Sequence, residues 1–414
     1  MTSLLKTRYR TLARLALGSL FGCLIFAQPR ADLSKLVFVG DSLTAGFQNF
    51  SLLETQQVHG YAALIANQAH TPIILPLIVS PGVPNVLQLV SVGPPPVIAP
   101  APGAPPAVPR RDPTAQPTDL AVPGMFLADL LNKRPDPAGT ALVDGLTNLV
   151  LGFPSPFIVP GQPRSQVEQA IALKPTTVIA WAGNNDVLFP ELFGSGIFPI
   201  TPIGDFYKSF DQLLDQLATT HARLVVANVP DVTLIPYLTP VTKFAKSVNL
   251  PVGFVAATLG VQPGDSLRPS ALPIAGAILA GATPGPLPAL CPGPIPGFPQ
   301  VPCVMTAAEI AQTRATVLAY NVIILFVALQ HNATVVDIYS LINGIAAHGV
   351  DVAGKHLTLD FLGGIASLDG MHPTNTGYAI IANEFIKTMN RQLAAGIPPV
   401  SVDQVALTDP LLPH

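Results

Sequence analysis

Two short motifs near opposite ends of the chain carry a hydroxyl, a carboxylate and an imidazole. The tetrapeptide GDSL occupies residues 40–43, and DGMHP occupies residues 369–373. An Asp three residues before a His can sit within one turn of it and bind Nδ1, which leaves Nε2 free to take a proton from a serine. Ser42, His372 and Asp369 are therefore candidates for a nucleophile, its general base and the partner that orients the base.

A glycine and an asparagine could supply the hydrogen-bond donors that a developing oxyanion needs. The segment GNND at residues 183–186 follows an apolar run, and Asn185 there can donate without acting as a competing base. Gly124 follows a weaker apolar run, and a glycine lets a backbone N–H approach a substrate closely. Each feature alone is equally typical of an ordinary turn, because Gly and Asn are common turn formers.

Other residues that could carry chemistry receive no role. A second GDSL tetrapeptide at residues 264–267 follows Gln-Pro rather than an apolar run, so no strand is predicted beneath it and Ser266 is interpreted as coincidental. His348 and His356 lack matching carboxylates at a metal-binding spacing. The sequence predicts neither a metal site nor a bound cofactor.

The elements that must position these residues alternate along the chain. Apolar runs typical of buried strands occupy residues 36–39, 120–122 (the weakest), 177–181, 223–228 and 333–338. Helical patterns occupy residues 60–70, 164–173, 206–218, 306–331 and 376–393. Continuous apolar strands that alternate with helices predict an α/β fold with a parallel sheet covered on both faces.

The predicted sheet would bring the candidate residues together. In a five-stranded sheet of order 2-1-3-4-5, the strand before Ser42 lies between the strands before Gly124 and Asn185, each about 4.8 Å away. Open α/β sheets bind ligands at the carboxyl ends of their strands. The two candidate oxyanion donors would therefore lie on either side of the candidate nucleophile.

Two proline-rich stretches, at about residues 72–117 and 236–302, interrupt the alternation. Neither has a clean period, so both are interpreted as insertions with extended, polyproline-like segments. The second leaves the sheet at its carboxyl edge, and we hypothesise that it walls or covers the site and favours acyl chains; a solvent-exposed decoration is the alternative. A hydrolase domain over residues 32–395 would contain both insertions, and the tail at residues 396–414 is predicted to be irregular.

The N-terminus indicates export. Four basic residues between positions 6 and 14 precede an uncharged run at residues 15–27, which is typical of a secretory signal and falls short of the roughly 20 residues that span a bilayer. We therefore expect residues 1–31 to be a signal peptide of a periplasmic or extracellular protein. The segment ending at Cys23 also resembles a bacterial lipobox, so a lipid-anchored form stays open.

Cysteine and charge usage agree with this interpretation. Cys291 and Cys303 flank a Pro/Gly-rich loop and are expected to pair in an oxidising compartment, which would stabilise the fold by about 3 kcal/mol; two free thiols are the alternative. The formal net charge of -3 leaves no basic footprint, so nucleic acid is not an expected partner.

In four blocks the sequence resembles the SGNH/GDSL hydrolase superfamily: KLVFVGDSLTAGF, DLAVPGMFLADLL, WAGNNDVL and DGMHPTNTGYAIIANEFI. The resemblance implies a flavodoxin-like three-layer α/β/α sandwich and metal-free esterase, lipase or acyltransferase chemistry. It also implies roles for the residues above: Ser42 as nucleophile, His372 as base and Asp369 as its partner, with an oxyanion hole formed by the Ser42 N–H, the Gly124 N–H and the Asn185 side chain. One departure is Asp119, where many relatives have Asn.

The sequence therefore predicts an exported serine esterase or lipase that hydrolyses small-molecule or lipid esters through an acyl-enzyme on Ser42. Contact with a membrane surface stays open. The nearest alternative is a carbohydrate O-acetylesterase on the same fold. A non-catalytic exported binding protein and a flavodoxin-like FMN protein are alternatives from other classes.

Overall fold

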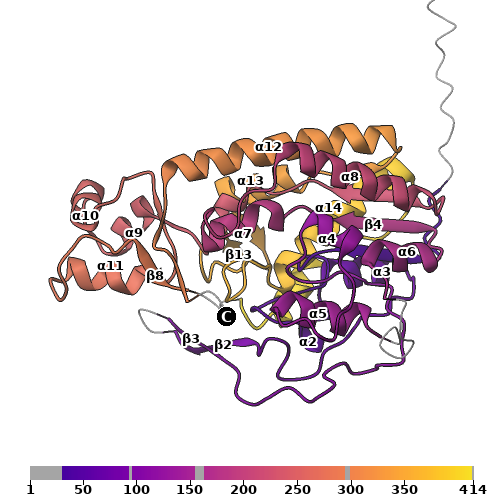
Figure 1. The fold of residues 1–414 in the computed structure, drawn as a ribbon, viewed down its shortest axis with the longest axis horizontal. Helices are drawn as coiled ribbons and strands as arrows, with labels where there is room; N and C mark the ends of the chain where they lie inside the picture. Colours follow the sequence, from indigo (N-terminus) through magenta and orange to yellow (C-terminus); the bar gives the residue numbers. More distant parts are fainter. Residues whose placement is uncertain (1–29, 93–95, 154–162, 294–298, 413–414) are drawn as a thin grey trace, which may run out of the picture.

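The computed structural model describes residues 30–92, 96–153, 163–293 and 299–412. Nearly all of the predicted signal peptide, including Cys23, lies outside these residues. Figure 1 shows a main body and a smaller lobe beside it.

A four-stranded parallel sheet forms the centre of the main body. It contains β1 (Leu36–Gly40), β4 (Thr177–Trp181), β5 (Arg223–Ala227) and β11 (Thr334–Val336), in the order β1-β4-β5-β11. Every residue of β1 and β4 is buried, as expected for continuous apolar strands that are covered on both faces. Four of the five predicted strands are thus confirmed.

The fifth predicted strand, at residues 120–122, does not form a regular strand. It nevertheless lies along the free edge of β1: the Phe38 N–H donates to the Thr118 carbonyl at 2.9 Å, and the Leu120 N–H donates to the Phe38 carbonyl at 2.9 Å. Prolines at positions 117 and 123 flank the segment and have no N–H with which to extend the ladder. The segment therefore extends the sheet by only a few hydrogen bonds.

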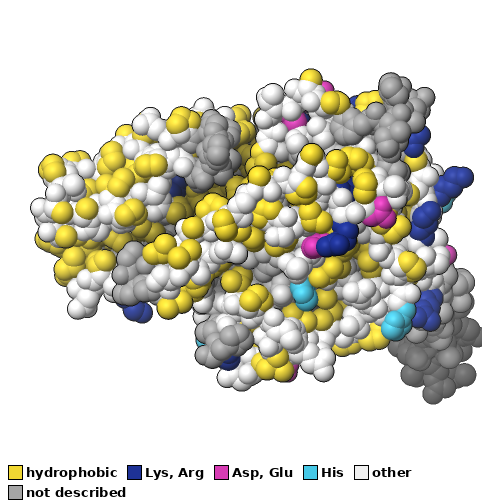
Figure 2. Space-filling view, turned by 90° about the horizontal axis from the view of Figure 1, so that it is seen from below, with side chains coloured by type: hydrophobic (Ala, Val, Ile, Leu, Met, Phe, Trp, Pro, Cys, Tyr) yellow, Lys and Arg dark blue, Asp and Glu magenta, His cyan; other side chains and the backbone are white. Residues whose placement is uncertain are grey.

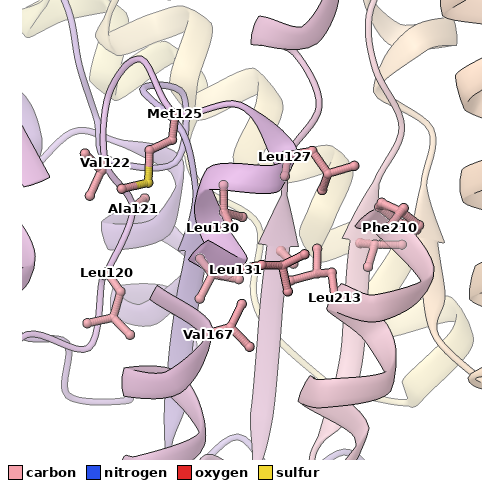
Figure 3. Packing of buried hydrophobic residues seen from close by; sticks show 14 of the residues in the cluster. Leu120, Ala121, Val122, Met125, Leu127, Leu130, Leu131, Val167, Phe210 and Leu213 are labelled. Carbon is pink, nitrogen blue, oxygen red and sulfur yellow. The ribbon is translucent and has the colours of Figure 1, made fainter. Parts of the chain in front are cut away.

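Helices cover both faces of this sheet. On one face lie α4 (Leu127–Asn132), α6 (Gln166–Ala172), α8 (Ile203–Ala218) and α12 (Ala307–Gln330). On the other lie α3 (Tyr61–Gln68) and α14 (Asn375–Leu393). Alternate residues of β1 enter the two cores, with Val37 and Val39 in the first and Leu36 and Phe38 in the second. Figure 3 shows side chains of α4, α6 and α8 meeting in the first core. The α/β fold with a parallel central sheet flanked by helices is confirmed.

The remaining elements of the main body are short. They are α2 (Glu54–Gln57), α5 (Leu142–Leu151), α7 (Asn185–Phe193), a 3-10 turn η1 (Val232–Leu234), α13 (Ile338–His348), β12 (Val350–Val352), β13 (Lys355–Leu357) and α15 (Val402–Thr408). The prediction of an irregular tail is wrong in one respect. The tail contains α15, which packs against α14, and its Val402 and Val405 pack on the second core.

The two insertions differ in structure. The first contains one hairpin, β2 (Leu87–Ser91) with β3 (Val97–Pro100), and is otherwise irregular. The second forms the lobe, shown at the left of Figures 1 and 2. Its elements are β6 (Thr239–Pro240), α9 (Val241–Ser247), α10 (Val252–Leu259), β7 (Ser266–Leu267), α11 (Ala271–Leu279), β8 (Leu290–Pro292), β9 (Gln300–Pro302) and β10 (Val304–Met305).

The lobe corrects the expectation of an extended, polyproline-like insertion. Its helices bury a separate apolar core that includes Val255, Leu259 and Ala275. Cys291 and Cys303 form a disulfide within the same core, as the sequence predicted. The prolines of the described part of the lobe lie between short elements, at their ends or, for Pro273, in the first turn of α11, which is where a missing N–H costs least.

Candidate active site

The loop after β1 and the loop before α14 bring a serine, a histidine and an aspartate into one line. His372 Nε2 lies 2.8 Å from Ser42 Oγ, although the two residues are 330 positions apart. On the other side of the ring, His372 Nδ1 lies 2.9 Å from Asp369 Oδ2. The structure therefore brings together all three residues singled out from their motifs.

Asp369 is held rigidly by backbone donors. Its Oδ2 accepts a hydrogen bond from the Phe50 N–H at 2.7 Å, and its Oδ1 accepts from the Met371 and His372 N–H groups at 2.8 Å each. Burial acts to raise the pKa of Asp369, but the neighbouring His372 and these hydrogen bonds outweigh it, so the pKa lies below its usual value. A carboxylate in this state can hold the imidazole in one orientation and stabilise its charged form.

Gln166 of α6 fixes the end of β1 just before Ser42. Its Oε1 accepts from the Gly40 N–H at 2.9 Å, and its Nε2 donates to the Gly40 carbonyl at 2.9 Å. The same amide contacts Met125 Sδ at 2.9 Å. A buried amide that binds both backbone groups of one residue fixes the turn on which the serine stands. No sequence pattern indicates this role, because Gln166 is one polar residue within a helix.

The loop after β4 is tied to the serine loop through two neighbouring residues. Asn184 Nδ2 donates to Asp41 Oδ2 at 2.8 Å, and the other Asp41 oxygen accepts from the Leu43 N–H at 3.0 Å. Burial raises the pKa of Asp41 to about 6, against the lowering effect of the Asn184 hydrogen bond. Both residues stand in predicted motifs, but neither was assigned a role from the sequence.

Asn185 contacts the segment that contains Gly124. Asn185 Nδ2 donates to the carbonyl of Met125, the residue after Gly124, at 2.7 Å. Gly124 has a φ of +84°, a conformation that other residues adopt only with strain. Asp186 supports the same region because its Oδ2 accepts from the Leu127 N–H at 2.9 Å, at the start of α4.

A narrow apolar cavity of about 80 Å³ borders His372. Leu43, Met371 and His372 line it from the loops after β1 and before α14, and Ile235 and Pro236 line it from the chain that leads into the lobe. Its further walls come from α13 and α14, including Ile342, Ile345 and Ile381. The space beside the imidazole is thus lined mainly by aliphatic side chains.

The root of the lobe is fixed to the loop that carries the aspartate and the histidine. The Tyr237 N–H donates to the Gly370 carbonyl at 2.9 Å. Gly370 has a φ of +69°, and a Cβ at this position would lie 2.9 Å from the Tyr237 nitrogen. Met371 packs against a cluster that contains Tyr237 and Leu238 of the lobe root and Phe193 of α7. The second insertion therefore begins in direct contact with the candidate site.

The second GDSL tetrapeptide lies elsewhere. No strand precedes it, as expected, and Ser266 itself stands on the two-residue strand β7, which pairs with β6 and β10 in the lobe's own small sheet. Asp265 accepts from the Gln262 and Ala307 N–H groups at 2.7 and 2.8 Å. Within the described part of the chain, no hydrogen bond joins the Ser266 hydroxyl to a histidine. The second tetrapeptide has a structural role.

The remaining candidates stay separate from the site. His356 Nδ1 lies 2.8 Å from Asp351 Oδ1 at the surface, and no group of three or more His, Cys, Asp or Glu able to hold a metal occurs among the residues that the structure describes. Asp119 is fully buried, and burial raises its pKa to about 8, with only the Ala121 N–H hydrogen bond acting against this.

Comparisons with known proteins agree with this geometry. A family model described as GDSL-like Lipase/Acylhydrolase matches residues 36–385. No curated protein matches the chain. Among solved structures, the chain is similar to LAE5, an alpha/beta hydrolase enzyme from the metagenome of Lake Arreo, Spain, with 15% sequence identity, a TM-score of 0.36, and coverage of 87% of this chain and 96% of that chain. A likeness at that TM-score supports no statement about function.

Proposed function

Because the chain belongs to the GDSL-like lipase/acylhydrolase family, we propose that it is a serine hydrolase of carboxylic esters with Ser42 as its nucleophile. The observation that carries the proposal is the unbroken hydrogen-bonded chain from Ser42 Oγ through His372 to Asp369. A nucleophile, its base and an orienting third group within hydrogen-bond reach are the geometric requirement for covalent acyl transfer.

The proposed reaction begins when His372 Nε2 takes the Ser42 proton as Oγ attacks the ester carbonyl carbon. The C–O π bond breaks, and its electron pair moves to the carbonyl oxygen. Collapse of this tetrahedral intermediate expels the alcohol, which receives the proton from His372. Water, activated by the same imidazole, then attacks the acyl-Ser42 ester, releases the carboxylic acid and restores the serine hydroxyl.

The oxyanion hole is proposed to contain the Ser42 N–H, the Gly124 N–H and the Asn185 side chain. The Asn185 amide has two N–H groups, and one of them binds the Met125 carbonyl. This bond aims the amide at the Gly124 region and leaves the second N–H for the substrate oxygen. One such donor typically lowers the barrier by about 3–4 kcal/mol.

For the fold, we assign residues 118–122 to the place of the fifth, edge strand in a flavodoxin-like order 2-1-3-4-5. The hydrogen bonds of this segment with β1 support the assignment. In this order the strand before Ser42 has the Gly124 segment on one side and the strand before Asn185 on the other.

We propose that the substrates are esters with an aliphatic acyl group. The cavity beside His372 would hold this group, and the lobe root supplies part of the cavity wall. The apolar lining and small volume of the cavity beside His372 support this. Initial rates with p-nitrophenyl esters of increasing acyl length, and with acetylated xylan, test the proposal. We expect faster hydrolysis of the aliphatic esters than of the acetylated polysaccharide. Hydrolysis of acetylated xylan but of no longer ester would favour the O-acetylesterase alternative.

We further propose that the protein is exported. The basic and apolar order of its first 27 residues supports this. So does the Cys291–Cys303 disulfide, because such bonds persist in oxidising compartments. Mass spectrometry of the extracytoplasmic protein would locate its N-terminus and reveal any lipid on Cys23.

A fluorophosphonate probe tests the nucleophile. We expect it to label the wild-type protein, to leave Ser42→Ala unlabelled and to label Ser266→Ala as strongly as the wild type. Ser266→Ala is a matched control because the same tetrapeptide surrounds it. Loss of labelling in Ser266→Ala together with retained labelling in Ser42→Ala would contradict the assignment.

A further inference from the structure

Two cavities lie on opposite sides of one set of apolar side chains. The small cavity beside His372 has a volume of about 80 Å³, and a second cavity has a volume of about 710 Å³. Five residues line both cavities and therefore stand between them: Leu234, Ile235, Pro236, Ile345 and Leu359. All five side chains are apolar, and the set is here called the dividing wall.

The two cavities lie in different parts of the molecule. His372 and Trp181, the last residue of β4, line the small cavity, which therefore begins at the sheet edge that carries the candidate site. The large cavity is lined from the lobe by Lys243 of α9 and Ser266 of β7, and from the main body by His348 at the end of α13. The large cavity thus lies between the lobe and the main body, and the dividing wall separates it from His372.

The dividing wall is built from two parts of the chain. Residues 234–236 belong to the lobe root, at the end of η1 and just after it. From the main body come Ile345 of α13 and Leu359 of the segment after β13. An ion pair between Lys243 of α9 and Asp360, the residue after Leu359, joins the same two parts. The wall therefore forms where the lobe root meets α13 and the segment after β13.

The residues of the dividing wall differ in how much they support the fold. Ile345 is 6% exposed and belongs to a small core with Val352 and Leu357. Leu234 and Leu359 are only partly buried, so their truncation should cost less stability than that of Ile345. One of the two comes from the lobe root and the other from the main body. Shortening both would therefore open the wall from both parts of the chain while Ile345 keeps its core packing.

We propose that the dividing wall limits the length of the acyl group that the protein accepts, with Leu234 and Leu359 as specificity-determining residues. The inference rests on the proposed esterase function, in which the small cavity holds the acyl group. A chain that enters beside His372 meets the wall before it can reach the large cavity. Each methylene that leaves water favours binding by about fourfold, so the wall removes this gain for every carbon beyond it. The large cavity has the room for those carbons, and Leu238 and Ile310 contribute apolar lining there.

Initial rates with p-nitrophenyl butyrate, octanoate and laurate test the proposal. We expect the double variant L234A/L359A to raise the ratio of kcat/KM for laurate to that for butyrate at least tenfold over the wild type, because the longer chain can pass into the large cavity. Ile342→Ala is the matched control: Ile342 lines the small cavity one helical turn before Ile345 and lies outside the dividing wall. It should change the ratio less than threefold. Retained fluorophosphonate labelling shows that the variants are folded.

A blocking substitution gives a second readout. Ala346 of α13 lines the large cavity, so Ala346→Phe fills part of the space beyond the dividing wall. Added to L234A/L359A, it should lower the laurate-to-butyrate ratio at least threefold and leave butyrate hydrolysis unchanged, a reversal that a mere loss of packing would not show.

Two failures can be told apart. Hydrolysis of butyrate by L234A/L359A with the wild-type chain-length profile, or a gain for laurate that Ala346→Phe leaves intact, would overturn the role of the dividing wall and leave the esterase proposal standing. A wild-type protein that hydrolyses none of the three esters would overturn the proposed function itself, and the inference with it.

Discussion

Asn184 Nδ2 lies 2.8 Å from Asp41 Oδ2, so the residue before the proposed oxyanion donor is bound to the residue before the proposed nucleophile. Both side chains are buried. This hydrogen bond joins the loops after β1 and β4, which are neighbours in the sheet. The spacing between the proposed nucleophile and the proposed oxyanion hole is therefore set by side chains that need not contact a substrate.

Replacement of Asn184 tests this coupling. Asn184→Ala removes the donor from a buried carboxylate, which typically costs about 1–3 kcal/mol of unfolding free energy. We expect kcat to fall at least tenfold, because Ser42 and Asn185 lose their fixed separation. Asn228→Ala breaks a second Asn–Asp hydrogen bond, to Asp337, and should affect stability but not kcat. Equal kcat values for Asn184→Ala and the wild type would exclude a positioning role.

Asp369→Asn tests the orienting carboxylate. The amide replaces an acceptor oxygen beside His372 Nδ1, so the imidazole loses the partner that holds its tautomer and stabilises its charge. We expect kcat to fall roughly a thousand- to ten-thousand-fold, as in other triads. Ester hydrolysis under saturating substrate measures the effect. A loss below threefold would remove Asp369 from the mechanism.

Gly124→Ala tests the backbone donor. A Cβ at Gly124 has space, since the nearest atoms lie 3.8 Å away, but the φ of +84° strains any other residue. We expect a loss of about 1–2 kcal/mol of stability and a clear drop in kcat with a small change in KM. Gly145→Ala in α5, where nothing lies within 4 Å, should be neutral or stabilising. A Gly124→Ala enzyme with unchanged kcat would argue against this donor.

Asp119→Asn should change the pH dependence of stability. Burial raises the native pKa of Asp119 from 3.8 to about 8, so the native state binds more protons than the unfolded state between these values. Its contribution to stability is full below about pH 4 and is lost as pH rises toward 8. The neutral amide avoids this loss. The free energy of unfolding of Asp119→Asn, relative to that of the wild type, should therefore be higher at pH 8 than at pH 4 by on the order of 2–5 kcal/mol. Chemical denaturation of both proteins at both pH values measures this difference.

The sheet edge that carries the candidate site could be predicted from the sequence, because its strands are buried and therefore apolar. The runs that became β1, β4 and β5 are continuously apolar, and the motif residues follow them directly. Parallel strands then bring distant motifs together at one edge. By contrast, Gln166 fixes Gly40 from inside a helix, where polar residues are usual, so no pattern marked it.

The lobe could not be predicted in the same way. Its helices are short, and α10 and α11 are nearly apolar, so these two show no alternation of polar and apolar residues. Such segments are covered by packing against each other, as Val255 of α10 and Ala275 of α11 are in the lobe core. The outer side of α12 was likewise hidden, because a helix that is apolar all round does not reveal which side is covered.

Mass spectrometry of the protein quenched during ester turnover tests the central claim most directly. We predict an acyl group on the peptide that contains Ser42, present in Ser266→Ala and absent in Ser42→Ala. An acyl group that forms on another residue, or steady turnover by Ser42→Ala, would contradict the account.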